Sequence, residues 1–517
     1  MTTPIQPLLD PDGIARLRAA LERGYTDEAV RSTLGLAGEA ALARGDLTGA
    51  GRLLDRSTDS ADWISLFLLG DTVPGRRAAA VLDPLPVDTA LAAGLLVAAG
   101  PDELRAGLDL RPYSEADGPQ WWVVSDLGAE IRPGPVDPEH VLGIGAAATT
   151  LAQATVRAPV DRALDVGTGC GVQALHLSRH SERIVATDIS ARALRMAATT
   201  AALSGVTLEL RRGSLLEPVA GEAYDLIVTN PPFIVGPGFT SATDGFTYRD
   251  SGFAGDGVTR ELLRSLPARL ADGGTAQLLA NWAVTAEQEW GERLEEWLHG
   301  SGCDAWIWQR EVADPAEYVA LWLRDSGERP GSPEYRRRYS AWLDWFGAHG
   351  VLAVGMGLVS LRRTGGSSSV VHEDVPQAVQ QPVGGEIEAW FGRHAWLGAR
   401  DATALRAARV VAAPDLVLEN RSLLGDRGWD TALSTLRQSH GMRWEIEVDA
   451  ATAGLVAAAR GALTLDQLIA VLARANDLDE RRLAEVAEPL LRDLIRRGFL
   501  IPVELASAEP ARGPGGR

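Results

Sequence analysis

The stretch Ala163-Leu-Asp-Val-Gly-Thr-Gly-Cys-Gly171 decides the fold of this 517-residue chain. Apolar residues lead into three glycines at alternating positions, and residues 172–178 after them have the pattern of a helix. Glycines between a strand and a helix allow a tight turn and let a ligand approach the backbone closely. The stretch therefore predicts a ligand-binding loop at the carboxyl end of a strand.

Strand-like and helix-like stretches alternate around and after this loop. The expected strands are residues 162–166, 183–187, 207–211, 226–229, 275–279, 305–312 and 351–361. The expected helices are residues 172–178, 191–204, 258–270 and 287–299, with a helical insert rich in Tyr, Trp and Arg over 330–350. Such alternation predicts an α/β domain with a parallel sheet and helices on both faces.

An acidic residue ends the second expected strand. Asp188 lies nineteen positions after Gly169, where a carboxylate can accept hydrogen bonds from ribose hydroxyls. The glycine spacing is GxGxG, with Val172 where a dinucleotide loop would place its third glycine. Asp165 precedes the glycines, and a carboxylate there can face a positively charged ligand group such as an ammonium. The pattern predicts a nucleoside-bearing ligand other than a dinucleotide.

Residues 165–171 resemble motif I of the class I S-adenosylmethionine-dependent methyltransferases, and Asp188 resembles their ribose-binding acid. The resemblance implies a Rossmann-like sheet, mostly parallel with an antiparallel last strand, that binds S-adenosyl-L-methionine. Ser214 departs from the Asp or Asn that this family often places on the adenine amino group, although a hydroxyl can still bond the base. The cofactor-binding residues implied are Asp165, Gly167, Thr168, Gly169, Gly171, Asp188, Ile189, Ser214, Leu215 and Asn230.

A second motif, Asn230-Pro-Pro-Phe233, follows the fourth expected strand. The two prolines fix the backbone and remove two N–H donors, so Asn230 lies beside carbonyls that only accept hydrogen bonds. A planar NH2 group can donate to the Asn230 side-chain oxygen and to the Pro231 carbonyl, while Phe233 stacks on its conjugated plane. Alignment of this poor nucleophile for direct displacement needs no general base. We therefore expect Asn230, Pro231, Pro232 and Phe233 to be the catalytic residues.

This motif resembles the NPP[YF] branch of methyltransferases over residues 141–363. Members of the branch act on the glutamine side chain of release factors or on amino groups of adenine and guanine. Residues 250–260 are similar to a glycine-rich segment of the glutamine enzymes, whereas Phe233 in place of Tyr is closer to the rRNA guanine enzymes, from which Ile234 departs because they usually have His there. The resemblance implies an N-methyltransferase of a protein glutamine. The alternatives are an rRNA amino group (guanine N2 or adenine N6) and a non-catalytic cofactor-binding interaction module.

The charge of the chain bears on the choice of acceptor. Its 50 basic residues are all Arg and face 69 acidic residues, which gives a net charge of −19. Binding of nucleic acid needs clustered basic charge, so this balance favours the protein acceptor, although Arg336–Arg338 form one local basic run. The absence of lysine excludes a Lys nucleophile, a Schiff base and a P-loop.

Composition also limits the cell compartment and the metal content. The two cysteines, Cys170 and Cys303, cannot build a disulfide framework or a CxxC metal site, so we expect no metal. The chain shows no secretory signal and no run of about 18 uncharged apolar residues. We expect a cytoplasmic protein with a macromolecular partner, a release factor or rRNA, and no membrane contact. Its oligomeric state is left open.

Five segments are expected along the chain. Residues 1–135 form a mostly helical domain, winged-helix-like if residues 104–110 and 121–124 are two strands around a turn. Residues 136–364 form the methyltransferase domain, and the Gly/Ser-rich start of 365–385 predicts a linker. Residues 386–505 form a second winged-helix-like domain, with helices at 463–473 and 480–497 and a strand at 499–503. Residues 506–517 are expected to be a disordered tail.

Overall fold

The computed structural model describes residues 4–115, 118–132, 137–238, 252–366, 368–426, 428–475, 477, 479–507 and 509–510. It divides into two compact units, each described here by itself. One comprises residues 1–152 and 158–374, and the other comprises residues 153–157 and 375–517. Within these described ranges, none of the helices combines the length and the apolar character needed to cross a membrane. Asp250, Ser251 and most of the predicted tail lie outside the described residues.

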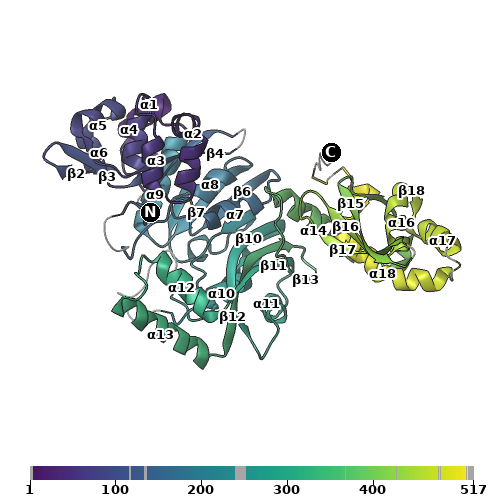
Figure 1. The fold of residues 1–517 in the computed structure, drawn as a ribbon. Coiled ribbons are helices and arrows are strands. Elements are labelled where there is room, and N and C mark those ends of the chain that lie inside the picture. Colours follow the sequence, from purple (N-terminus) through teal and green to yellow (C-terminus); the bar gives the residue numbers. More distant parts are fainter. Residues whose placement is uncertain are drawn as a thin grey trace. The chain divides into compact units, whose positions relative to one another are not determined.

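The first unit begins with a helical region that packs on an aromatic core (Figure 1). Tyr25 stacks on Trp63 at 5.1 Å, and Phe67 adds a second stack on the same indole. The helices are α1 (Pro11–Gly24), α2 (Asp27–Ala43), α3 (Leu47–Leu53), α4 (Ala61–Trp63), α5 (Gly75–Leu82) and α6 (Val87–Ala92). A three-stranded sheet of order β1-β3-β2 completes the region, with β1 at Val73–Pro74, β2 at Leu96–Gly100 and β3 at Glu103–Ala106.

The hairpin expected in this region has a different first strand. β4 (Asp109–Ser114) pairs with β5 (Gln120–Ser125), whereas the expected strand at 104–110 is wrong, because residues 103–106 form β3 in another sheet. Gly107 separates the two strands, and a side chain there would meet the Gly94 carbonyl at 2.4 Å. Hydroxyls of helix α9 (Ala191–Ser204) accept hydrogen bonds from the backbone of β5, so this hairpin is tied to the α/β region.

The centre of the first unit is an eight-stranded sheet of order β13-β11-β12-β10-β9-β6-β7-β8. Five neighbouring strands are parallel, and β12 runs antiparallel to both β10 and β11, which confirms the predicted fold class. Each of the seven expected strands overlaps a strand of this sheet. The strands are β6 (Val160–Val166), β7 (Ser181–Asp188), β8 (Glu209–Arg212), β9 (Tyr224–Thr229), β10 (Leu270–Thr285), β11 (Cys303–Ala313), β12 (Val351–Arg363) and β13 (Val370–Asp374).

Strand β13 lies inside the segment predicted as a linker. It pairs in parallel with β11, and the Trp306 indole donates to Glu373 at 2.8 Å. The strand is polar and only partly buried, and for that reason its sequence lacks the apolar pattern of the inner strands. The expectation of a linker over residues 370–374 is therefore wrong.

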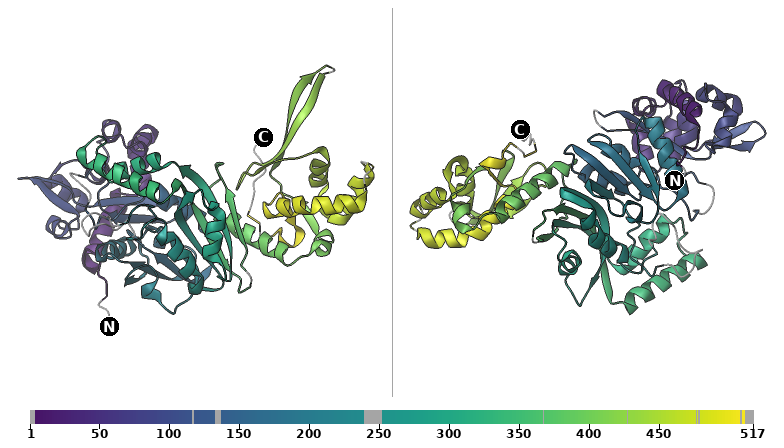
Figure 2. Two further views of the ribbon diagram at one scale, coloured as in Figure 1. Left: turned by 90° about the horizontal axis from the view of Figure 1, so that it is seen from below. Right: turned by 180° about the vertical axis from the view of Figure 1, so that it is seen from behind.

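Helices cover the sheet, and the carboxyl ends of β6, β7, β8 and β9 meet at one edge (Figures 1 and 2). In open α/β sheets, ligands bind at this edge. The insert between β11 and β12 has two helices, α12 and α13, and the helical stretch predicted over 330–350 covers only the second of them. The helices of this part are α7 (Ala146–Ala154), α8 (Val172–Leu177), α9, α10 (Gly257–Ser265), α11 (Trp290–Leu298), α12 (Pro315–Asp325) and α13 (Pro333–Ala348).

The second unit combines helices with two small sheets. One sheet has the order β18-β14-β19, and the other is a long hairpin, β15 with β16, flanked by β17. The sequence analysis did not predict the hairpin, and the winged-helix-like form of both flanks stays a prediction. The elements are α14 (Gly384–Gly398), α15 (Ala402–Arg406), β14 (Arg409–Ala412), β15 (Leu416–Gly425), β16 (Gly428–Gln438), β17 (Glu445–Glu447), α16 (Ala450–Ala458), β18 (Arg460–Thr464), α17 (Leu465–Ala475), α18 (Glu480–Arg496) and β19 (Leu500–Pro502).

Candidate active site

The glycine loop between β6 and α8 opens toward a cavity. Gly167, Gly169 and Gly171 all have positive φ, a conformation that favours glycine. A side chain on Gly167 or Gly169 would meet no atom within 4 Å, so both face open space. A side chain on Gly171 would lie 3.2 Å from Cα of Ala197, so this glycine serves the close packing of α9 rather than the cavity.

Two carboxylates hold the loop. Asp188 accepts from the Gly169 amide at 2.9 Å through one oxygen and from the Ser190 amide at 2.8 Å through the other. Each oxygen retains lone-pair capacity, and Asp188 lines the cavity. Burial raises its pKa. The carboxylate thus fixes the loop and still offers acceptors to a ligand hydroxyl.

Asp165 lies at the end of β6, below the loop and fully buried. Thr168 donates to its Oδ2 at 2.6 Å, while Oδ1 has no hydrogen-bond partner among the described residues. Burial, with a smaller contribution from the negative charge of Asp188, raises the pKa of Asp165 to about 7. A buried carboxylate with an unused oxygen suits a cationic ligand group close by.

The turn after β8 supplies another wall of the cavity. Ser214 and Leu215 both line it, and Ile189 lines it beside Asp188. Leu215 has φ of 45°, which is unusual for a residue with a Cβ. The Gly213 amide donates to the Asp188 carbonyl at 3.0 Å and so fixes the start of this turn. The strained Leu215 backbone is held where a flat ring could lie against it.

Asn230 and the two prolines form the opposite wall. Thr229 donates to the Val166 carbonyl at 2.8 Å and locks the end of β9 to the end of β6. Asn230, Pro231 and Pro232 line the cavity. The side-chain oxygen of Asn230 is buried, and no described residue donates to it. An unsatisfied buried acceptor costs about 1–3 kcal/mol, so this oxygen has unused capacity for a donor beyond the described residues.

Phe233 does not line the cavity. Its ring packs edge-to-face on Trp322 of α12, with the centroids 6.1 Å apart. Tyr318 and Trp342 of the same insert hold Val235, two residues later, since the Tyr318 hydroxyl accepts from the Val235 amide and the Trp342 indole donates to its carbonyl. The insert therefore positions the chain just after the NPPF motif.

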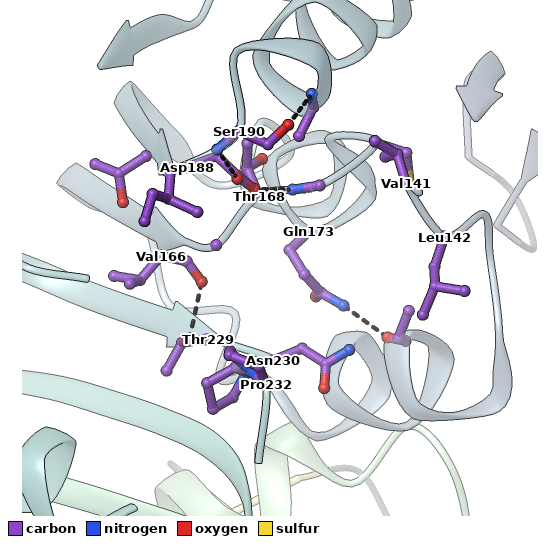
Figure 3. A pocket seen from close by; sticks show the side chains of 18 of the residues that line it. Val141, Leu142, Val166, Thr168, Gln173, Asp188, Ser190, Thr229, Asn230 and Pro232 are labelled. Atoms are coloured by element: carbon purple, nitrogen blue, oxygen red, sulfur yellow. Dashed lines mark hydrogen bonds between the residues drawn. The ribbon is translucent and has the colours of Figure 1, made fainter. Parts of the chain in front are cut away.

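The cavity measures about 360 Å³ and brings the candidate residues together. In Figure 3, Asp188, Thr168 and Ser190 lie on one side, Thr229, Asn230 and Pro232 lie on the other, and Gln173 lies between them. Among the predicted site residues, the cavity is lined by Gly167, Thr168, Gly169, Asp188, Ile189, Ser214, Leu215, Asn230, Pro231 and Pro232. Asp165, Gly171 and Phe233 lie behind this lining.

The sequence analysis missed residues that also line the cavity. Gln173 is buried, and its amide donates to the Ala148 carbonyl at 2.7 Å. Val141 and Leu142 lie at the right of the cavity in Figure 3. His140 also lines the cavity, and its Nδ1 lies 3.8 Å from Asp126. The available signal for Gln173 was a polar side chain directly after the glycine loop, in the first turn of α8. The other residues lie in an irregular segment that carries no motif.

Two further candidate segments serve structural roles where they are described. Asp256, in the glycine-rich segment after the motif, forms a two-pronged ion pair with Arg293. In the basic run, Arg337 pairs with Glu334 and Arg338 pairs with Glu328. Among the described residues, no group of three or more His, Cys, Asp or Glu side chains is arranged to hold a metal ion.

Comparison with known proteins matches these observations. Residues 143–247 match the family model described as methyltransferase small domain. Residues 22–107 and 388–502 match models described as domains of unknown function, DUF7059 and DUF7782.

Two kinds of curated relative are found. The ribosomal protein uL3 glutamine methyltransferase of Bradyrhizobium diazoefficiens is 30% identical over 34% of this chain and 57% of its own length. The release factor glutamine methyltransferase of Xylella fastidiosa is 35% identical over 27% and 52%. The ribosomal RNA small subunit methyltransferase C of Cronobacter sakazakii is 30% identical over 42% and 58%. The chain thus spans about half the length of these relatives.

A solved 16S rRNA methyltransferase from T. thermophilus aligns over 50% of this chain and 66% of its own, with 18% identity and a TM-score of 0.25. The sheet itself is more informative, because five parallel strands are followed by an antiparallel one between β10 and β11. Together with the match of residues 143–247 to the methyltransferase small domain, this strand arrangement shows that the eight-stranded sheet has the methyltransferase fold.

Proposed function

We propose that the chain is an S-adenosylmethionine-dependent N-methyltransferase that acts on a planar, conjugated NH2 group. The observation that carries this proposal is the buried side-chain oxygen of Asn230, which lacks a donor among the described residues and belongs to a cavity wall with Pro231 and Pro232. Neither proline has an N–H, so the backbone of Pro231 and Pro232 beside Asn230 offers acceptors only. An NH2 group satisfies such a wall, whereas a hydroxyl or a thiol brings only one proton.

The residues present fit the proposed cofactor. Its ribose hydroxyls would meet the free lone pairs of Asp188, its adenine would lie between Ile189 and Leu215, and its ammonium would lie near Asp165. The open faces of Gly167 and Gly169 leave room for it. When bound, the cofactor supplies an electrophilic methyl group. The chain's own task is to orient the acceptor nitrogen, because an amide nitrogen is a poor nucleophile in free solution.

A cofactor-binding role for Asp188 gives a direct prediction. Asp188→Ala should weaken binding of S-adenosyl-L-methionine about 10- to 100-fold, because charge-assisted hydrogen bonds to hydroxyls are each worth about 1.5–3 kcal/mol. Isothermal titration calorimetry measures the change. Asp161→Ala is the matched control, since Asp161 is an exposed Asp that pairs with Arg183 in the same region. Equal affinities of wild type and Asp188→Ala would remove Asp188 from the binding site.

For the acceptor, we propose a glutamine side chain of a protein of the translation machinery, of the release-factor type. The net charge of −19 supports a protein over RNA. The basic run supports it as well, since Arg337 and Arg338 are already neutralised by Glu334 and Glu328. The rRNA alternative is favoured by the similarity to the small subunit methyltransferase C enzymes over the larger share of the chain.

A transfer assay with labelled methyl groups tests the proposal. The purified chain is offered release factors, ribosomal proteins and ribosomal RNA from a bacterial extract, each with the labelled cofactor. We expect label in protein, on glutamine, after digestion and mass spectrometry. Label in RNA alone would reject the glutamine acceptor and keep the N-methyltransferase, whereas transfer to none of these pools would contradict both.

A further inference from the structure

The long hairpin of the second unit has apolar residues at its tip that no described residue of the unit covers. Leu423, Leu424 and Trp429 are 68%, 71% and 74% exposed. Figure 2 shows the hairpin projecting from the rest of its unit. β17 pairs with β16 only as far as Thr435, so the distal ribbon consists of two strands. An isolated two-stranded ribbon is marginally stable in water, and one with an apolar tip calls for a partner.

Strand β15 is the open edge of this sheet. Its neighbour on one side is β16, and the sheet order β15-β16-β17 leaves its other side without a strand. The register shift between Arg421 and Ser422 places the extra residue on β16, as Ala432, so β15 itself stays regular from Leu416 to Gly425. Long regular edges that carry no proline or bulge are templates for pairing with another strand.

The sequence of β15 is complementary to itself in reverse. In an antiparallel pairing of two copies centred on Asn420, Glu419 of each copy lies opposite Arg421 of the other. Glu419 already accepts from Arg437 at 2.7 Å, and the guanidinium of Arg421 has no ion-pair partner among the described residues. In the symmetric pairing, Glu419 of each copy is the partner of Arg421 of the other copy, so the ion pair forms twice. Opposite charges directly across two strands stabilise the pair.

The apolar residues match in the same register. Val417 lies opposite Leu423 of the second copy, and Leu416 lies opposite Leu424. Leu424 faces Trp429 across its own hairpin, so the exposed tip of one copy would cover the exposed base of the other. A shift by one residue in either direction would place Glu419 opposite Asn420 or Ser422 and so lose the charge match.

We propose that two copies of this chain associate through their β15 strands, antiparallel about a two-fold axis at Asn420. Each copy presents the same surface to the other, which is the arrangement of an isologous dimer. The proposal uses only residues of the hairpin and does not depend on the enzymatic activity.

Sedimentation of the full-length protein over a range of concentrations tests the association. We expect a species of twice the 55.0 kDa chain mass. Arg421→Glu places carboxylates opposite each other at both charge pairs and should weaken the dimer about 10-fold or more. Exchanging the two residues in the variant Glu419→Arg/Arg421→Glu restores opposite charges and should restore the dimer. Glu447→Arg, on the other edge of the same sheet, is the control and should remain dimeric.

A disulfide test fixes the register. Residue 420 lies opposite its own copy at the two-fold axis, where directly paired Cα atoms are about 4.5–5.5 Å apart, within reach of a disulfide. Asn420→Cys should therefore form a cross-linked dimer on mild oxidation, and Thr435→Cys on the inner strand should not. The native Cys170 and Cys303 are buried. A wild type that stays monomeric, an uncrosslinked Asn420→Cys, or a double exchange that fails to restore the dimer would overturn the proposal.

Discussion

Asn230→Ala is expected to lower the rate of methyl transfer by about 100-fold or more while the affinity for S-adenosyl-L-methionine stays the same. The side-chain oxygen of Asn230 is the acceptor that orients the NH2 group, and a preorganised hydrogen-bonding group at a reacting centre is worth about 2.7–4 kcal/mol. The loss should appear in kcat and in kcat/KM together, because the contact matters most in the transition state. Single-turnover kinetics with the identified acceptor measure the rate, and calorimetry measures the affinity.

Two further variants make this result specific. Asn230→Asp keeps a side-chain acceptor at the same place and should retain a larger part of the activity than Asn230→Ala. Asp188→Ala should show the opposite pattern. Its affinity for the cofactor should fall, whereas its turnover should recover at saturating cofactor. Unchanged turnover in Asn230→Ala would show that Asn230 does not orient the acceptor, whereas a joint loss of cofactor binding would assign it to the cofactor instead.

The buried strands and the two motifs could be predicted from the sequence because their structure depends mainly on residues that are neighbours in the chain. β9 is a run of apolar residues that leads into Asn230, and the glycines of the β6 loop mark a turn that only they adopt easily. The chain order of these strands was enough to predict the sheet. The predicted residues from Gly167 to Pro232 that line the cavity come from strand ends, where neighbouring parallel strands bring distant segments to one edge.

The remaining features depend on contacts between segments far apart in the chain. The expected stacking of Phe233 on the acceptor stays a prediction. Its ring packs edge-to-face on Trp322 of the insert, and nothing near Phe233 in the sequence signals that packing. Strand β13 is only partly buried and the hairpin strand β15 is exposed, so they lack the alternation of apolar residues that burial imposes. Asp165 was predicted from its place before the glycines, yet its raised pKa follows from a burial that only the fold creates.

Replacement of Asp165 by asparagine should stabilise the ligand-free protein, and the gain should grow with pH. Burial raises the pKa of Asp165 to about 7, above that of an unfolded Asp. As the pH rises from about 4 to 7, the unfolded chain loses this proton before the folded protein does, so the free energy of unfolding falls. The full cost of the buried charge, about 4 kcal/mol, is present above pH 7. Asp165→Asn removes that cost, and its amide oxygen still accepts from Thr168.

Denaturant unfolding at pH 5 and pH 8 measures this difference, with Asp161→Asn as the control, because the exposed Asp161 has no such burial cost to release. A stability gain that is the same at both pH values would contradict a raised pKa of Asp165. The same variant should bind S-adenosyl-L-methionine more weakly at pH 8, because the uncharged amide cannot attract an ammonium group. Stability and binding should therefore change in opposite directions, as expected where a protein holds an unfavourable charge in place for a ligand.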